Sequence, residues 1–451
     1  MKKYNSFIFD SIALDQREGR IEMRYSLDEK EFFLEQINLP FGFEFMPVSL
    51  ALLDRAFFAL HLIGGISYYK TCCPPSIEVR SGTLSKEQAG FWNEVYEKGL
   101  MEFFFENNIN PGGLINFPPR EHAALLEMER PKIESKILVP LGGGKDSVVT
   151  AEILKNAGWD VTLLRVGSNP LIEELARSME LPLMSMERTL SPRLFELNKE
   201  GAMNGHIPIT AYISFVGISA ALMYGFDMVA MSNEKSADEG SLEKWGKKIN
   251  HQWSKSWEFE KLLIDYVKNF ITKDVRYFSL LRHLSELSIT KYFCTMPKYF
   301  NLITSCNRNW RIENSAMHHS PASADSGAWC CECPKCASSF AMFSAFLPKE
   351  TLLGMFGKNM FDDQSLELLY KELLGVEGVK PFDCVGTIDE IRSAFLLAHE
   401  KGDFDSSRIM QMFLKEVSPK IKDPSETIRK SLEPGSVHAI PDEFLTAIHE
   451  T

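Results

Sequence analysis

The most informative stretch of the sequence is KILVPLGGGKDS, residues 136–147, which joins a short apolar run to three glycines and a polar segment. Residues 136–141 have the length and composition of a buried strand, and residues 147–157 follow with a helical pattern that stops at Gly158. Consecutive glycines tolerate positive φ and let a backbone approach an anion closely. Backbone N–H groups before and at a helix N-terminus hold phosphate. The stretch therefore predicts a nucleotide-phosphate loop between a strand and a helix.

The spacing within this loop excludes two common nucleotide motifs. A Walker A loop needs Gly-x-x-x-x-Gly-Lys-Ser/Thr, and the dinucleotide fingerprint needs a third glycine where Ser147 stands. The remaining pattern resembles the PP-loop of ATP pyrophosphatases, Ser-Gly-Gly-x-Asp-Ser, although Gly142 replaces its first serine. Such enzymes cleave ATP between the α and β phosphates and transfer AMP to a substrate oxygen. The alternative is a plain glycine turn before a helix that Asp146 caps.

The PP-loop resemblance implies roles for each residue of the loop. The residues expected to bind the nucleotide are Gly142, Gly143, Gly144, Lys145, Asp146 and Ser147. Lys145 would neutralise the departing pyrophosphate, and Asp146 would hold Mg²⁺. We therefore count Lys145, Asp146 and Ser147 among the catalytic residues as well.

The segments around the loop predict the fold class. Further strands are expected at residues 161–166, 183–186 and 228–231, with helices at 171–179 and 209–224 between them. This alternation predicts an α/β fold with a doubly wound parallel sheet, of the PP-loop or adenine nucleotide α-hydrolase-like type. Ligands in such sheets lie beyond the carboxyl ends of the strands. The expected domains are an N-terminal α+β domain at 1–130, a PP-loop ATP-binding domain with a cysteine cluster at 131–345, and a helical C-terminal region at 346–451.

Composition and charge exclude several classes of protein. The 451 residues are 45% hydrophobic and 24% charged, and 49 Lys and Arg against 61 Asp and Glu give a net charge of −12. These values exclude a disordered chain and argue against non-specific nucleic-acid binding. Residues 207–226 carry no charge over a length that could span a bilayer, but Pro208, two glycines and several hydroxyl side chains favour a buried helix. We expect a cytoplasmic enzyme without a membrane or nucleic-acid partner, and the sequence does not indicate its oligomeric state.

Three polar clusters lie around residues 204–208, 231–237 and 250–256, and two of them are expected to flank strands of the sheet on the side where the loop opens. Their amides, hydroxyls and charges suit a polar, carboxylate-bearing substrate, and the predicted substrate-binding residues are Asn204, Asn233, Lys235, Ser236, Asn250 and Gln252. The candidates for proton transfer are His206, Glu234, His251 and Lys255. Each cluster also has a simple structural interpretation, because Asn-Gly forms turns, serines cap helices and lone histidines are often structural.

Four motifs in this order resemble the MurL type of UDP-N-acetylmuramoyl-L-alanyl-L-glutamate epimerases. They are LGGGKDS, NGHIPITA, AMSNEKSA and NHQWSKS, and the similarity extends to WCCECPKC at 329–336 and KPFDCVG at 380–386. The resemblance implies an ATP- and Mg²⁺-dependent isomerase of peptidoglycan precursor synthesis, and thus of the cell wall and cell shape. Its small-molecule substrate would be the UDP-muramoyl dipeptide, whose terminal L-Glu becomes D-Glu as AMP and pyrophosphate are released.

The implied chemistry explains why ATP is needed. A carboxylate disfavours a neighbouring carbanion, whereas the carbonyl of an acyl-adenylate accepts its electrons, so that a base can remove the α-proton. Inversion then needs proton donors on both faces, or one base that reaches both. The sequence neither ranks His206, Glu234, His251 and Lys255 nor assigns them to faces.

The cysteines suggest a metal site in a reducing compartment. Cys330, Cys333 and Cys336 form a C-x-x-C-x-x-C pattern, and with Cys306 upstream they could hold structural Zn²⁺. A similar set occurs in PP-loop deazaguanine synthases, where the position of Cys331 is usually glycine, so Cys331 is not expected to ligate. The alternative is a group of buried reduced cysteines.

Two rival functions follow from the same motifs. One is a PP-loop ligase or amidotransferase of the deazaguanine synthase kind, and the other is a zinc-dependent binding module with a degenerate nucleotide fold. If the substrate is the UDP-muramoyl dipeptide, basic side chains must bind its anionic part. The candidates, chosen by position alone, are Lys235, Lys255, Arg308 and Arg311.

Overall fold

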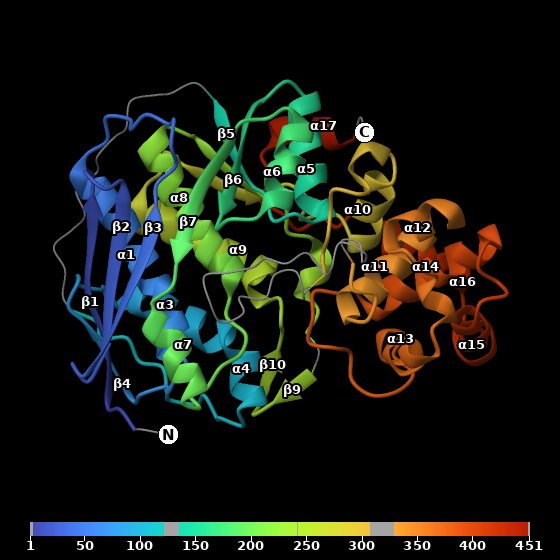
Figure 1. Cartoon of the computed structure of the whole chain (residues 1–451), viewed down its shortest axis with the longest axis horizontal. Helices are drawn as coiled ribbons and strands as arrows, with labels where there is room; N and C mark the ends of the chain where they lie inside the picture. Colours follow the sequence, from blue (N-terminus) through green and yellow to red (C-terminus); the bar gives the residue numbers. More distant parts are fainter. Residues whose placement is uncertain (1–2, 121–134, 241, 307–328, 450–451) are drawn as a thin grey trace.

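The computed structural model describes residues 3–120, 135–240, 242–306 and 329–449 of the chain. Its main feature is a nine-stranded sheet in the order β11-β8-β5-β6-β7-β3-β2-β1-β4, with β11 at one edge and β4 at the other. Figure 1 shows the N-terminal strands on the left and β5, β6 and β7 nearer the middle of the molecule. Helices pack on this sheet, and a separate two-stranded ribbon is formed by β9 (Leu242–Lys244) and β10 (Lys247–Ile249).

Five parallel strands form one half of the sheet, as the alternation of strands and helices predicts. They are β5 (Lys136–Pro140), β6 (Asp160–Val166), β7 (Leu183–Thr189), β8 (Met228–Met231) and β11 (Arg276–Ser279), the last of which the sequence analysis missed. The chain proceeds from β5 through β6 to β7 on one side, and then through β8 to β11 on the other. The direction of winding therefore reverses between β5 and β8. In open α/β sheets the ligand crevice lies at this switch point, beyond the carboxyl ends of the strands.

The other half of the sheet comes from the N-terminal residues. Its strands are β1 (Ser6–Asp15), β2 (Arg20–Leu27), β3 (Glu31–Asn38) and β4 (Ser76–Val79). Strand β3 pairs antiparallel with β7, so that the sheet continues without a break from one half to the other. The strands of residues 1–130 thus share one sheet with the parallel strands.

A buried ion pair fixes the seam between the two halves. Arg188 of β7 donates from Nε and Nη2 to the two carboxylate oxygens of Glu35 on β3, at 2.8 and 3.0 Å. The Tyr212 hydroxyl also donates to Glu35, at 2.9 Å, and the guanidinium lies 3.8 Å from the centre of the Tyr212 ring. Because a register slip would leave these buried charges unpaired, the contact specifies how β3 and β7 align.

Helices cover both faces of the sheet. Helix α8 (Ile209–Tyr224) packs on one face together with α1 (Leu50–Gly64), while α5 (Lys145–Asn156) and α6 (Pro170–Met179) cover the other. Strand residues alternate accordingly, since Leu138 joins the first core while its neighbours on β5 join the second. The uncharged stretch at 207–226 is therefore mostly a buried helix, as predicted.

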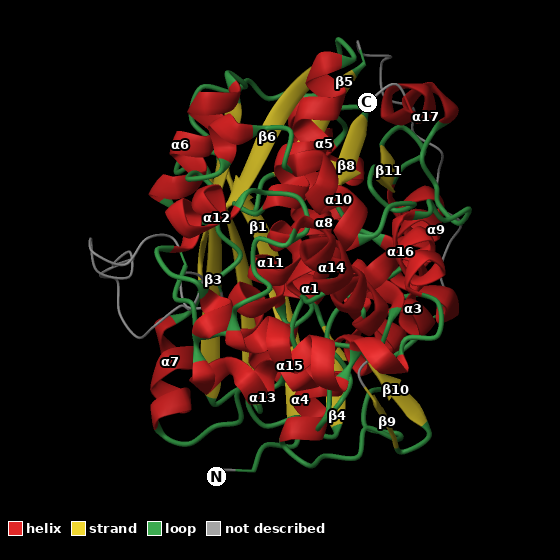
Figure 2. Ribbon diagram, turned by 90° about the vertical axis from the view of Figure 1, so that its right-hand side faces the viewer, coloured by secondary structure: helices red, strands yellow, loops and turns green. Residues whose placement is uncertain are grey.

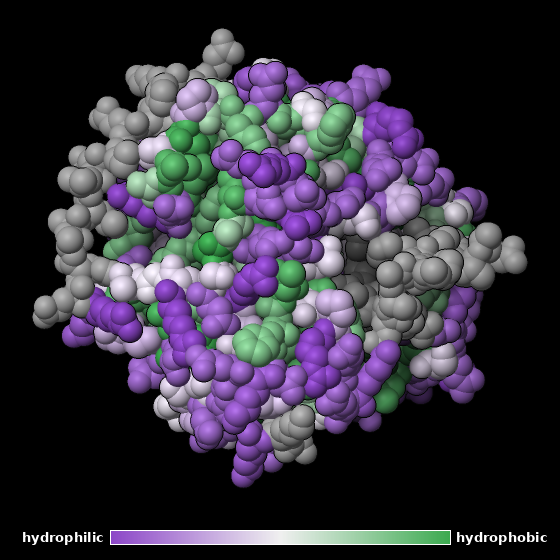
Figure 3. Space-filling view, turned by 60° about the vertical axis from the view of Figure 1, so that its left-hand side comes forward, coloured by the Kyte–Doolittle hydropathy of each residue, from purple (hydrophilic) through white to green (hydrophobic). Residues whose placement is uncertain are grey.

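One segment among the described residues is long and apolar enough to cross a membrane. It is Leu50–Tyr69, which comprises α1 and α2 (Ile66–Tyr69), and 72% of its apolar window is buried inside the fold, where α1 packs against α8. The surface over the N-terminal strands mixes hydrophobic and hydrophilic residues (Figure 3). Among its exposed large side chains are Phe32 and Phe41.

The remaining helices before residue 300 are α3 (Lys86–Gly99), α4 (Met101–Glu106), α7 (Pro192–Lys199), α9 (Trp257–Tyr266) and α10 (Glu286–Phe293). The capping box predicted at Ser85 is present. Ser85 Oγ accepts from the backbone N–H of Gln88, and the Gln88 side chain accepts from the backbone N–H of Ser85.

The C-terminal region is helical, as predicted, and gathers on the side opposite the N-terminal strands (Figure 1), in front of the sheet in Figure 2. Its helices are α11 (Pro334–Ser344), α12 (Lys349–Phe356), α13 (Glu367–Leu373), α14 (Ile388–Lys401), α15 (Arg408–Glu416) and α16 (Pro424–Leu432). The last helix, α17 (Asp442–His449), returns to α5, where the Phe444 ring lies 4.6 Å from that of Trp159.

Candidate active site

The three glycines form a loop between β5 and α5, at the switch point of the sheet. Gly143 has a φ of +80°, a conformation that favours glycine, and its carbonyl accepts a hydrogen bond of 2.9 Å from Thr304 N. A Cβ on Gly144 would lie 3.3 Å from Ser305 Oγ, so a side chain there would press on the neighbouring segment. The residue that begins α5 as its N-cap is Gly144 and not Asp146. The loop therefore does not match the simple alternative of a turn before a helix that Asp146 caps.

The side chains at the start of α5 form a charged cluster. Lys145 Nζ lies 2.7 Å from Asp146 Oδ1 and 3.2 Å from Oε1 of Glu286, at the start of α10. Burial opposes the charge on Lys145, but these two carboxylates raise its pKa above the usual value. Burial likewise opposes the charge on Asp146, whose pKa Lys145 lowers. Ser147 Oγ donates to the carbonyl of Gly144 at 3.1 Å and so supports the loop itself.

Glu234 and Lys255 meet this cluster from the other side of the switch point. Glu234 follows β8, is 4% exposed, and its Oε2 has no hydrogen-bond partner among the described residues. Burial raises the pKa of Glu234, and Lys255 opposes that rise. Burial also disfavours the charge on Lys255, but Cys384, Glu234 and Asp146 raise its pKa. The structure thus brings three predicted site residues, Asp146, Glu234 and Lys255, into one electrostatic cluster.

A buried ion pair holds the backbones of Glu234 and Lys255 together. Arg282 donates to the carbonyl oxygen of Glu234 at 2.7 Å and to that of Lys255 at 2.6 Å. It also pairs with Glu260 at 2.6 Å, and both of these side chains are only 1% exposed. Neither residue was predicted from the sequence, because an Arg and a Glu at distant positions carry no signal of pairing.

A second cluster contains the two predicted histidines. The rings of His206 and His251 lie 4.3 Å apart, and His251 Nδ1 bonds to the carboxylate of Glu102 on α4. Burial, and after it His251, lowers the pKa of His206 to about 3. Burial acts against His251 too, but hydrogen bonds to Cys384 and Glu102 raise its pKa to about 10. At neutral pH His206 is therefore neutral while His251 carries a proton.

Lys70 borders this second cluster and was not predicted from the sequence. It is 6% exposed and donates to the Asn204 side chain and, at 3.2 Å, to the carbonyl of Gly205. Burial lowers its pKa to about 8. Lys70 thus fixes the loop that carries Asn204 and His206, and it adds a positive charge to the site.

The other predicted substrate-binding amides lie in different surroundings. Asn233 Nδ2 donates to Ser279 Oγ at 3.0 Å, and Asn250 Nδ2 donates to the carbonyl of Ala237 at 2.8 Å, so both amides have partners within the fold. Gln252 is 4% exposed, and its Oε1 has no hydrogen-bond partner among the described residues. Gln252 thus keeps a buried amide oxygen that could accept a hydrogen bond from a ligand.

Lys235 and Ser236 belong to a separate surface hollow of about 390 Å³ between η1 (Lys235–Asp238) and the start of α14. Lys235 Nζ donates to the carbonyl of Glu433, and Ser236 Oγ donates to Glu390 at 2.8 Å. The hollow is not lined by the glycine loop or by either histidine. The structure thus places these two predicted residues beside the site, whereas Arg308 and Arg311 lie outside the described residues.

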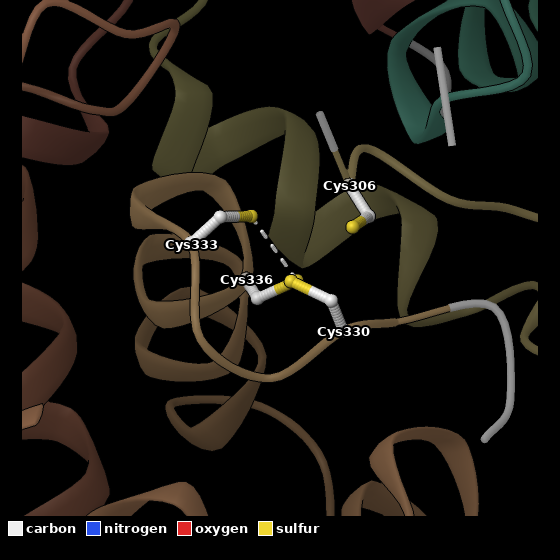
Figure 4. Close-up of side chains that lie close together, drawn as sticks. All are labelled: Cys306, Cys330, Cys333 and Cys336. Carbon is white, nitrogen blue, oxygen red and sulfur yellow. Dashed lines mark hydrogen bonds between the residues drawn. The ribbon is translucent and has the colours of Figure 1, made fainter. Parts of the chain in front are cut away.

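The four predicted zinc ligands come together beside the glycine loop. The sulfur atoms of Cys306, Cys330, Cys333 and Cys336 all lie within 4.8 Å of one another, and their side chains converge (Figure 4). The Cys333–Cys336 and Cys330–Cys336 sulfur distances are 3.5 and 3.7 Å. Tetrahedral zinc with Zn–S bonds near 2.3 Å places sulfurs about 3.8 Å apart. The donor set and its spacing therefore fit Zn²⁺.

Cys331 lies outside this cluster. Its φ of +55° is in the region that glycine prefers, and its thiol faces the carbonyl of Phe356 at 3.2 Å.

On the other side of the cluster, Cys306 N donates to Oγ1 of Thr304, the residue that bonds to Gly143. The cysteine cluster is thus joined to the glycine loop through one short segment.

Comparisons with known proteins agree with the motifs. Residues 1–280 match the MurL N-terminal domain, and residues 302–428 match the MurL C-terminal domain. The UDP-N-acetyl-alpha-D-muramoyl-L-alanyl-L-glutamate epimerase of Xanthomonas oryzae pv. oryzae is 37% identical over 94% of this chain and 92% of its own length. The protein of that name from a Micromonospora species is 33% identical over 99% of this chain and 98% of its own length.

Proposed function

The chain belongs to the MurL family, and we propose that it inverts the terminal L-Glu of UDP-N-acetylmuramoyl-L-alanyl-L-glutamate to D-Glu at the expense of ATP. The names of its relatives support the epimerase activity and the substrate, because the sequences of these relatives match nearly the whole chain. A UDP-linked muramoyl substrate would place the enzyme in peptidoglycan precursor synthesis in the cytoplasm. The ATP-dependent route is our inference from the site.

The observation that carries this route is the convergence of a glycine loop, Lys145 and Glu234 at the switch point of the parallel sheet. The backbone N–H groups of the glycine loop and the N-terminus of α5 suit the binding of a phosphate group. Attack by the glutamate carboxylate on the α-phosphate of ATP would form an acyl-adenylate and release pyrophosphate. Lys145 and Lys255 would stabilise the negative charge that develops there.

Asp146, at the start of α5, would be the carboxylate that holds Mg²⁺ at the same place. Glu286 and Glu234 add negative charge to its surroundings, and Oε2 of Glu234 is buried without a partner among the described residues. When bound, Mg²⁺ would neutralise the phosphate oxygens of ATP. The cysteine cluster would hold Zn²⁺ in a structural role and brace the segment against which Gly143 lies.

Proton transfer is assigned to the cluster of His206 and His251. Opposite pKa shifts in neighbouring groups separate a base from an acid, and here His206 is neutral while His251 is protonated. Burial holds His206 in its neutral form and makes it a weak base, whereas His251 holds a proton that it could donate. The other two candidates, Glu234 and Lys255, interact electrostatically with Asp146 of the glycine loop. They therefore suit adenylation better than proton transfer.

The direct test is pyrophosphate release from ATP with the L-Glu and D-Glu forms of the muramoyl dipeptide in parallel. We expect pyrophosphate release with the L-Glu form, which is the proposed substrate. In D₂O, deuterium should enter at the glutamate α-carbon only when ATP is present. Exchange without ATP would remove the chemical reason for the loop. Turnover that requires ammonia would instead support a ligase or amidotransferase.

A further inference from the structure

Lys70, which directly follows α2, is a buried cation without a carboxylate partner among the described residues. The other lysines and arginines that are buried in the described part of the chain are Lys145, Arg165 and Arg282. Each of them forms an ion pair with a carboxylate at 2.6 or 2.7 Å. Burying a charge is costly unless the charge is paired. A lysine that is 6% exposed and unpaired therefore indicates that an anionic ligand binds beside it.

The ammonium group of Lys70 keeps one hydrogen-bond donor for this anion. Of its three N–H groups, one donates to Oδ1 of Asn204 and another to the carbonyl of Gly205 at 3.2 Å. The third has no partner in the part of the chain that the structure describes. Burial lowers the pKa of Lys70 to about 8, so most of the ammonium stays charged at neutral pH.

Asn204 supplies a second donor beside the ammonium. Its Oδ1 accepts from Lys70 and, at 2.9 Å, from the backbone N–H of Gly205, whereas its Nδ2 has no hydrogen-bond partner among the described residues. Oδ1 and Nδ2 belong to the same amide group, so Nδ2 lies close to the ammonium. The two groups together offer a donor to each oxygen of a carboxylate. Because Asn204 is exposed, a ligand can reach this pair of donors from solvent.

The position of His206 places these donors next to the histidine cluster. His206 directly follows Gly205, and its ring lies 4.3 Å from that of His251. The acidic side chains of this region do not neutralise Lys70, because Glu102 bonds to His251 and Glu106 is exposed and forms no ion pair with Lys70. The anion that pairs with Lys70 must therefore come from a ligand bound near the two histidines.

We propose that Lys70, together with Asn204, binds the side-chain carboxylate of the terminal glutamate and thereby selects glutamate over its uncharged analogues. This inference rests on the proposed function, in which the α-proton is exchanged at the histidines. The α-carboxylate is not the anion at Lys70, because it is the group that ATP activates at the glycine loop. The diphosphate lies at the other end of the substrate, beyond the alanine and the muramoyl sugar. The side-chain carboxylate is the remaining anion close to the reacting carbon.

The decisive experiment compares two substrates that differ only in this carboxylate. UDP-N-acetylmuramoyl-L-alanyl-L-glutamine keeps the α-carboxylate that is adenylated but replaces the side-chain carboxylate with an amide. Measured by AMP formation, the wild-type kcat/KM should be at least about thirtyfold higher for the L-Glu dipeptide, because a buried charge is left unpaired with the amide. Equal use of the two dipeptides by the wild-type protein would overturn the proposal without any variant.

Variants of Lys70 then connect this preference to its charge. Lys70→Gln removes the charge but keeps an N–H donor for the loop, and it should lose most of the preference for the L-Glu dipeptide. Lys70→Arg keeps the charge and should retain the preference. Asn107→Ala is the matched control, because Asn107 Nδ2 donates to the carbonyl of Asn204 at 3.4 Å and so supports the same loop without a charge. It should change kcat/KM for both dipeptides by the same factor.

The role of Lys70 and the proposed function fail in different ways. If the wild-type protein forms no AMP with the L-Glu dipeptide, the proposed function is wrong. If it does form AMP, but Lys70→Gln lowers kcat/KM for both dipeptides equally and keeps the wild-type preference, Lys70 only supports the loop and its proposed role is wrong. Calorimetric titration with the two dipeptides gives the same comparison for a variant that binds them without turnover.

Discussion

Replacing Arg282 with methionine should destabilise the protein and disturb the site together. The change leaves the Glu260 carboxylate, 1% exposed, without the two hydrogen bonds of 2.8 and 2.6 Å that it accepts from Arg282. Removing one partner of a buried ion pair typically costs about 3–5 kcal/mol, because the other charge stays buried and unpaired. The carbonyls of Glu234 and Lys255 also lose a donor, at about 1–3 kcal/mol for each group that stays unsatisfied. We therefore expect the free energy of unfolding to fall by at least about 3 kcal/mol.

Urea unfolding followed by tryptophan fluorescence measures this loss, and pyrophosphate release measures the effect on the site. The double variant Arg282→Met with Glu260→Gln should recover part of the stability, since the unpaired charge is gone. Arg429→Met is the matched control, because its ion pair with Glu426 is exposed and should not shift the unfolding midpoint. A loss below about 1 kcal/mol in the single variant, or no recovery in the double variant, would contradict the reasoning.

Three further predictions follow from other parts of the structure. Asp146→Asn should reduce pyrophosphate release by about 10²–10³ without unfolding the protein, because Lys145 and the nucleotide lose a preorganised charge; wild-type turnover would refute the PP-loop role. Metal analysis should find one zinc per chain in the wild type and in Cys331→Gly, but none in Cys336→Ser, and zinc-free wild-type protein with titratable thiols would exclude the site. Burial lowers the pKa of His61 to about 3, so the unfolded state binds a proton near pH 6.5 that the folded state does not. The contribution of His61 to the free energy of unfolding should therefore be fully present above about pH 6.5. It should fall by up to about 1.4 kcal/mol per pH unit towards pH 3. Urea titrations at several pH values measure this slope, which His61→Gln should reduce.

Several features could be predicted from the sequence because they depend on local periodicity and backbone conformation. The order of strand, three glycines and helix at 136–147 predicted the loop after β5, and Gly143 indeed takes a positive φ. The alternation that follows predicted the parallel strands, and the pattern at Ser85 predicted the start of α3. The uncharged run at 207–226 predicted a buried helix, because its proline, glycines and hydroxyl side chains suit a protein core better than a membrane span.

Other features came only from tertiary structure, because contacts between distant residues leave no mark on local pattern. The N-terminal strands join the parallel sheet through the pairing of β3 with β7, for which the Glu35–Arg188 ion pair gave no local signal. The same holds for Glu102 on α4, which bonds to His251, and for Lys70, which directly follows α2 and bonds to Asn204 beside His206. In the C-terminal region, only the WCCECPKC and KPFDCVG motifs indicated residues that lie near the cysteine cluster or the candidate active site.

The charges of the site depend on tertiary structure for the same reason. His206 and His251 look alike in the sequence, yet burial makes one neutral and the partners Cys384 and Glu102 keep the other protonated. A pKa depends on the desolvation and the neighbouring charges of a group, and both arise only when the chain has folded. The sequence thus determined which chemical groups are available, while the packing of α4, the loop before α8 and the segment before α14 determined which of them hold a proton.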